Sequence, residues 1–180
     1  WDETFLIKSV RCLCELNEFD CSSINCSNTP LNSIVAILLS RYPQTLANIK
    51  KCKDALSMMV EEFPLTAWEV IKRILPSGES AIIGNAKPQF ILTIIERKEI
   101  SKEDYTNYVK FIFEKAICIA EKNLDKLADL LKYVVYLPLD YSTNLFNQIK
   151  SISSNKNDEE KYTVWSKLKE LRHSIIKINN

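Results

Sequence analysis

The sequence has little glycine and histidine, and it has no long apolar run. Its two glycines, Gly78 and Gly84, both fall between residues 77 and 100, the one stretch without helical periodicity. A single histidine, His173, excludes metal sites built from several histidines. No apolar run approaches the roughly 20 residues of a membrane-spanning helix. The sequence therefore predicts neither a membrane protein nor a histidine-rich metal centre.

The chain also lacks an excess of charge of either sign. Its 24 lysines and arginines are balanced by 23 aspartates and glutamates, which gives a net charge of +1. Such a balance exerts no long-range attraction on nucleic acid or acidic lipid. The 180-residue chain, with 46% hydrophobic and 26% charged residues, has the composition of a globular domain that buries a core without disulfides. It starts at Trp1 rather than at methionine, and we expect a piece of a longer cytoplasmic polypeptide.

What the sequence does have is helical periodicity, since apolar residues recur every three or four positions outside 77–100. The pattern predicts an all-α fold of about eight helices in stacked antiparallel pairs, either an α-solenoid-like segment or an irregular bundle. Only FILTII at 90–95 permits a short strand. We expect a single helical domain over 1–180, comprising a four-helix part at 1–76, an irregular connection at 77–100 and a second four-helix part at 101–180.

The apolar stripes also predict which side chains face the core. The first helix contributes Phe5, Leu6, Val10, Leu13 and Leu16; the fourth contributes Leu65, Trp68, Ile71, Ile74 and Leu75; the last contributes Tyr162, Trp165, Leu168, either Leu171 or Arg172, and Ile175. The sequence SKED at 101–104 has the form of a capping box, in which Ser101 accepts from the backbone three residues on.

Four of the six cysteines fall in CLCELNEFDCSSINC at 12–26, which raises the question of a metal site. Cys12 and Cys14 lie two residues apart on a predicted helix, so their side chains point about 200° apart and cannot both reach one ion. The spacings of the four thiols do not match the C-x2-4-C knuckle of structural zinc sites. Cys21 and Cys26 flank a loop, where they are able to approach each other.

The remaining thiols, Cys52 and Cys118, occupy apolar helical positions that are typical of buried free cysteine. We therefore predict small packing residues in a reducing cytosol, with no metal and no cofactor. A small metal- or thiol-dependent protein built on Cys21 and Cys26 is the competing interpretation.

No combination of nucleophile, base and orienting group can be assembled from the spacing, so the sequence predicts no enzyme and no catalytic residue. His173 lies near a helix end, and the adjacent carboxylates Glu61 and Glu62 do not converge on one point. Lys50, Lys51 and Lys53 form a small basic cluster. This cluster leaves a helical nucleic-acid-binding module as a further alternative.

Four blocks of the sequence resemble a known family. They are NTPLNSIVAILLSRYPQTLA at 28–47, DALSMMVEEFPLTAWEVIKRILP at 54–76, ADLLKYVVYLP at 128–138 and VWSKLKELRHSI at 164–175. Their order and spacing resemble the α-helical repeat or sensor region of large bacterial STAND-type antiviral NTPases. The most specific elements are Pro30 to Ser33 and Tyr42 to Thr45, while the chain departs from the family between Asp20 and Asn28.

The resemblance implies a sensor or scaffold segment. In that family the helical region recognises a protein, such as a viral structural component, and relays binding to NTPase and effector modules elsewhere in the parent chain. Oligomerisation through the parent chain is a further expectation. The partner is then a protein or another domain of the parent, and not a membrane or a nucleic acid. Asn32 and Gln44 fall in the motif and are interpreted as structural, so the resemblance carries over no functional residue.

Overall fold

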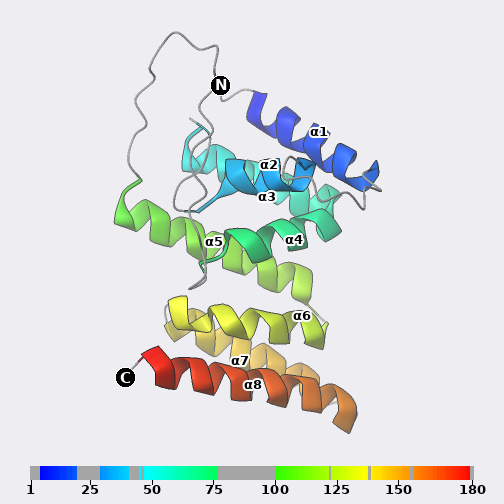
Figure 1. Ribbon diagram of the computed structural model, residues 1–180, viewed down its shortest axis with the longest axis vertical. Helices are drawn as coiled ribbons and strands as arrows, with labels where there is room; N and C mark the ends of the chain where they lie inside the picture. Colours follow the sequence, from blue (N-terminus) through cyan, green and yellow to red (C-terminus); the bar gives the residue numbers. More distant parts are fainter. Residues whose placement is uncertain are drawn as a thin grey trace. The chain divides into compact units, whose positions relative to one another are not determined.

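The described part of the chain is helical. The computed structural model describes residues 5–19, 29–40, 45, 47–76, 100–121, 123–137, 139–154 and 156–178. Within these ranges the chain forms eight α-helices and no strand, which confirms the predicted all-α fold (Figure 1). In chain order the elements are α1 (Leu6–Phe19), α2 (Pro30–Leu38), α3 (Ile49–Glu62), α4 (Pro64–Ile74), α5 (Lys102–Ala120), α6 (Leu124–Asp129), the 3-10 helix η2 (Leu130–Tyr136), α7 (Leu139–Ser153) and α8 (Asp158–Ile178).

The helices divide into two compact units, and the division falls inside α5. The first unit contains α1 to α4 and α5 up to Ile112, and the second contains α5 from Phe113 together with α6, η2, α7 and α8. The sequence predicts a single domain whose two four-helix parts are joined by an irregular connection at 77–100, and all of that connection except Ile100 lies outside the described residues, as does the segment at 90–95. Since helical periodicity continues without interruption through α5, no sequence signal marks the observed division.

Side-chain caps fix where several helices begin. A side-chain oxygen of the cap residue accepts the backbone amide three residues on, which replaces an acceptor missing in the first turn. These bonds join Thr29 to Asn32 at 3.1 Å, Asn48 to Lys51 at 3.0 Å and Asn123 to Lys126 at 3.0 Å. At α5 the Ser101 hydroxyl oxygen accepts from the Asp104 amide at 3.0 Å, which confirms the predicted capping contact.

The core of the first unit lies where α1 packs against α2 and α3, and where α4 packs against α2 and α3. Two buried hydroxyls join helix ends to their neighbours. Tyr108 in α5 donates to the carbonyl of Leu38 at 3.1 Å, and Ser40 donates to the carbonyl of Ile74 at 2.8 Å. The fully buried apolar side chains of this unit include Val10, Cys14, Ile34, Leu38, Leu56, Met59, Ile71, Ile74 and Tyr108.

The predicted inward stripes of α1 and α4 are partly wrong. Phe5, Leu16 and Leu65 are exposed rather than buried. The buried line on α1 is Leu6, Val10 and Cys14, at a strict four-residue spacing. Leu16 follows Cys14 by two residues and so points about 200° away from it. Phe5 precedes the helix, and Leu65 lies in the first turn of α4, where it points to solvent.

In the second unit α6 contacts α7 and α8, and η2 packs against the same two helices. Helix α6 ends at Asp129, and the chain tightens into the 3-10 helix η2 from Leu130. Because a 3-10 helix repeats every three residues, side chains at that spacing share a face. Leu127, Leu130 and Tyr133 accordingly form one buried line, although Tyr133 had not been predicted as a core residue.

The prediction for α8 is also mostly wrong. Of the predicted inward stripe only Leu171 is buried, whereas Tyr162, Trp165, Leu168 and Ile175 are exposed. The second buried residue of the helix is Val164, which lies one position before Trp165 and therefore about 100° around the axis from it. The contact of α8 with α6 and η2 is made by this other side of the helix.

No helix within the described ranges combines the length and the apolar character that are needed to cross a membrane.

Candidate functional site

The exposed side of α8 carries two aromatic rings and several cations. Tyr162, Trp165, Lys169 and Arg172 follow one another at intervals of three, four and three residues, and Lys161 precedes Tyr162. Helical geometry places side chains at these intervals on one side of the helix. The five residues are named here the aromatic face of α8. Tyr162 is 64% exposed and Trp165 is 55% exposed, against 6% for Val164 and 7% for Leu171 on the buried side.

The two rings of this face are held in contact with each other. The centroids of Tyr162 and Trp165 lie 5.7 Å apart with an angle of 32° between the ring planes. The ammonium nitrogen of Lys169 lies 5.3 Å from the centroid of the Trp165 ring, within the range of a cation–π contact. Because these contacts restrict the rings before any partner arrives, binding through them loses little side-chain entropy.

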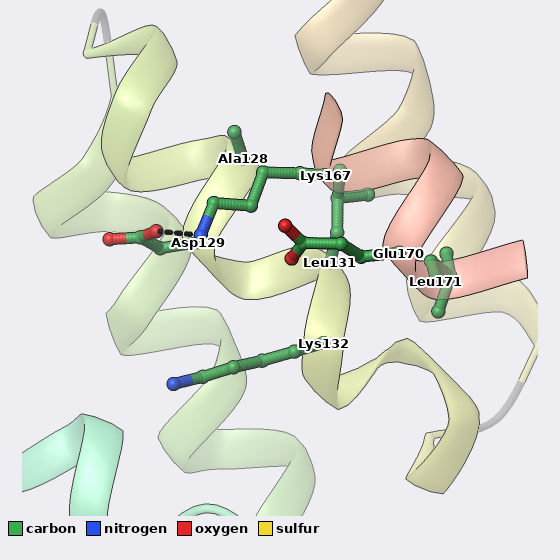
Figure 2. Close-up of a pocket in the computed structure, with 7 residues that line it drawn as sticks. All are labelled: Ala128, Asp129, Leu131, Lys132, Lys167, Glu170 and Leu171. Atoms are coloured by element: carbon green, nitrogen blue, oxygen red, sulfur yellow. Dashed lines mark ion pairs between the residues drawn. The ribbon is translucent and has the colours of Figure 1, made fainter. Parts of the chain in front are cut away.

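The other side of α8 is fixed to the rest of its unit. Ala128, Leu131 and Leu171 line a groove beside α8, and the Lys167 ammonium lies 3.6 Å from a carboxylate oxygen of Asp129 (Figure 2). The groove between them holds about 120 Å³. Small-molecule sites occupy roughly 300–1,000 Å³, so this groove is too small for a metabolite or cofactor. The contacts around it hold α8 in place and present the aromatic face outward.

A second hollow lies between α5 and α7 and has a volume of about 330 Å³. Its wall includes the Tyr141 hydroxyl, which donates to a carboxylate oxygen of Glu114 at 2.9 Å. Partial burial raises the pKa of Tyr141, and the hydrogen bond to Glu114 and its charge raise it further. Tyr141 therefore stays protonated at neutral pH, and it also packs edge-on against Phe113 with centroids 6.4 Å apart. This arrangement joins α5 and α7.

The structure separates the cysteines that it describes. Cys12 is exposed and Cys14 is buried, which agrees with their opposite directions on the helix but contradicts a packing role for Cys12, whereas Cys52 is buried as predicted. Cys118 is exposed, so its predicted burial is wrong; it lies two positions from both Ala116 and Ala120, which occupy the buried side of α5. Cys21 and Cys26 lie outside the described residues. Among the residues that the structure does describe, no group of three or more histidine, cysteine or acidic side chains is placed to hold a metal ion.

Alkylation of the intact chain is expected to distinguish these thiols. Burial raises the pKa of Cys14 to about 12, and the neighbouring charges of Glu18 and Glu15 add to the effect, so this thiol remains protonated and unreactive near neutral pH. With N-ethylmaleimide at pH 7.5, we expect Cys12 and Cys118 to be modified fully before Cys14 and Cys52, as measured by peptide mapping. Equal rates for Cys12 and Cys14 would contradict the burial of Cys14; denatured chain is the control, in which all rates should converge.

The other candidates from the sequence have structural partners. The Asn32 side-chain oxygen accepts from Arg73 at 2.8 Å and joins the start of α2 to α4, whereas Gln44 lies outside the described residues. Glu62 pairs with Arg11 through two bonds of 2.6 and 2.9 Å, so it ties α3 to α1. His173 is exposed, with Nδ1 2.7 Å from the Lys169 carbonyl oxygen. The ammonium of Lys53, in the predicted basic cluster, lies 5.3 Å from the centroid of the Phe111 ring.

Sequence reasoning missed the aromatic face because it assigned Tyr162 and Trp165 to the core. A signal was present, since Lys161, Lys169 and Arg172 also fall at helical spacing from the two rings, together with the apolar Leu168. In a helix that packs against a core, cations lie only at the edges of the apolar stripe. On α8, however, Lys169 lies between Trp165 and Arg172 on the same side of the helix.

Comparison with known proteins adds no match to these observations. Scans of the chain against protein-family models, curated proteins and solved structures find no similar protein.

Proposed function

We propose that the chain is a non-catalytic, helical protein-interaction segment that acts as a sensor within a large bacterial STAND-type defence protein. In this proposal it recognises a viral or other protein and relays binding to NTPase and effector modules elsewhere in the parent chain. The four sequence blocks that resemble such proteins support the sensor assignment. The single observation that supports protein binding is the aromatic face of α8.

The chemistry of this face favours a protein partner. Tryptophan, tyrosine and arginine are the residues most enriched among those that dominate binding energy at protein interfaces. All three occur here on one helix, with Tyr162 and Trp165 more than half exposed. Each ring offers a large apolar area, and burying about 100 Å² of it would contribute about 2.5 kcal/mol. Exposing both rings is a cost to solubility that a partner would remove.

The two grooves of the second unit do not favour a different function. The groove at Lys167 and Asp129 is too small for a metabolite, and the hollow at Tyr141 holds its hydroxyl on Glu114. A helix array that recognises its partner by an extended surface needs neither pocket.

Native mass spectrometry of the full chain tests this proposal. The chain is measured alone and mixed separately with viral capsid, portal, terminase and tail proteins. We expect a metal-free mass and a stoichiometric complex with one of these classes, because the proposed function needs a protein partner and no cofactor. The matched control is Lys150→Glu on α7, an exposed position away from the aromatic face, which should form the same complex.

Two outcomes would contradict the proposal. The first is the absence of a complex with every class of viral protein. The second is a zinc adduct that disappears when Cys21 and Cys26 are replaced by serine, since this would favour the metal-dependent alternative.

A further inference from the structure

The charges around Tyr162 and Trp165 are not balanced. Lys161, Lys169 and Arg172 lie on the same side of α8 as the two rings, against the carboxylate of Asp158 and that of Glu159, which precedes Tyr162 by three residues. The Asp158 carboxylate lies 4.0 Å from Lys161, so it offsets only one of the three cations. The face therefore combines an apolar centre with an excess of positive charge, although the whole chain carries only +1.

We propose that the aromatic face of α8 docks an acidic amphipathic helix of a partner protein. The apolar side of that helix covers Tyr162 and Trp165, and its aspartates or glutamates reach Lys161, Lys169 and Arg172. This inference rests on the proposed function and specifies the partner that the surface would take.

The shape of the surface favours a helix over an extended peptide. Side chains at three- and four-residue intervals form the ridges into which a second helix packs, at an interaxial distance of about 8–10 Å. From Tyr162 to Arg172 the face extends about 15 Å along the axis, which matches about three turns of a partner helix. An extended peptide binds by adding a strand to a sheet edge, and the described part of the chain contains no strand.

Charge complementarity selects an acidic partner over a second copy of the same chain. A second copy would bring an equally positive face, and in an antiparallel pair centred on Trp165 each Lys161 would approach the Lys169 position of the other copy. Asp158 would approach Arg172 at the rim, but the central repulsion beside the rings would remain. An acidic helix meets all three cations with opposite charge.

The ring geometry argues against nucleic acid. Base stacking requires an open aromatic face, and the Lys169 ammonium already lies 5.3 Å from the Trp165 centroid.

A display selection tests the inference with the full chain. The probe is a yeast-display library of helical peptides of about 18 residues, with leucine fixed at one face and Asp, Glu, Lys, Arg, Ser or Gln varied elsewhere. We expect the enriched peptides to carry a clear excess of Asp and Glu beside the leucine face. Enrichment of neutral or basic peptides, or no enrichment, would overturn the inference.

The most enriched peptide is then measured by fluorescence anisotropy against variants of the chain. Trp165→Ala is expected to weaken binding at least about tenfold, and Lys169→Glu by about tenfold, with affinity falling as salt increases. Lys150→Glu makes the same charge change away from the face and should bind as the parent chain does. Circular dichroism checks that each variant stays folded. Equal affinity for Trp165→Ala and the parent would overturn the inference even if acidic peptides were enriched.

Two further measurements address the other occupants. A single-stranded oligothymidylate of about 20 nucleotides that binds more tightly than the peptide, and loses affinity in Trp165→Ala, would assign the face to nucleic acid instead. A dimer in sedimentation that is lost in Trp165→Ala would assign it to a second copy.

The failure of the docking inference and the failure of the proposed function are distinguishable. If a viral protein complex persists with Trp165→Ala, the proposed function stands and the docking inference fails. If acidic peptides bind this face while no viral protein binds the chain, the docking inference stands and the proposed function fails.

Discussion

Replacing Tyr108 by alanine is expected to lower the free energy of unfolding by about 3–5 kcal/mol. The ring is 1% exposed, so the substitution leaves a cavity in the first unit. It also removes the hydroxyl that donates to the Leu38 carbonyl at 3.1 Å, at the last residue of α2. Burial raises the pKa of Tyr108 well above its ordinary value, so the hydroxyl remains a donor throughout the pH range of the measurement. Hydrogen exchange of amides in α2 and α4 reports the loss of stability.

A second substitution separates the two contributions. Tyr108→Phe keeps the ring and leaves the buried carbonyl of Leu38 without this donor, which should cost about 1–3 kcal/mol. Tyr162→Ala removes an exposed tyrosine and should stay within about 0.5 kcal/mol of the parent. If Tyr108→Ala were as mild as Tyr162→Ala, the placement of α5 against α2 would be wrong.

Tyr133→Ala is expected to have a comparably large effect in the second unit, about 3–5 kcal/mol. The Tyr133 ring is 1% exposed and lies in the buried line that the 3-10 geometry of η2 creates with Leu127 and Leu130. Exchange rates of amides in α6 and α8 are the measurement, because both helices contact η2 or the residues beside it.

The matched control is Tyr136→Ala, at the last residue of the same helix. Tyr136 is 43% exposed, so its truncation should change the free energy of unfolding by less than about 1 kcal/mol. A regular α-helix over the same residues would bury Val134 in place of Tyr133. Similar costs for Tyr133→Ala and Tyr136→Ala would therefore argue against the 3-10 conformation.

The sequence predicts the fold class and several helix ends because both depend on local chemistry. Thr29, Asn48 and Ser101 bind backbone amides three residues on, and the contact follows from residue type and position alone. Pro30 and Pro64 begin helices for the same local reason. Periodicity likewise predicts a helix wherever apolar residues recur, which holds for every described element.

Tertiary choices are not encoded in this local pattern. On α8 two sides of the helix carry apolar residues, and periodicity does not say whether Val164 or Trp165 meets α6 and η2. Packing against the neighbouring helices determines which side of α8 is buried, since the smaller Val164 and Leu171 fit there. The conversion of the chain to a 3-10 helix at Leu130 and the division inside α5 also depend on packing between elements. Sequence reasoning missed the aromatic face because local periodicity does not determine which side of α8 packs against α6 and η2.

The two sides of α8 have separate mutational constraints. Val164 and Leu171 are buried and constrain the fold, whereas Lys161, Tyr162, Trp165, Lys169 and Arg172 have exposed or partly exposed side chains. Exposed substitutions away from buried contacts usually change the free energy of unfolding by less than about 0.5 kcal/mol, so changes on the outer side should leave the inner packing intact. Point mutations can therefore change the chemistry of the outer side of α8 while the helix keeps its packing against α6 and η2.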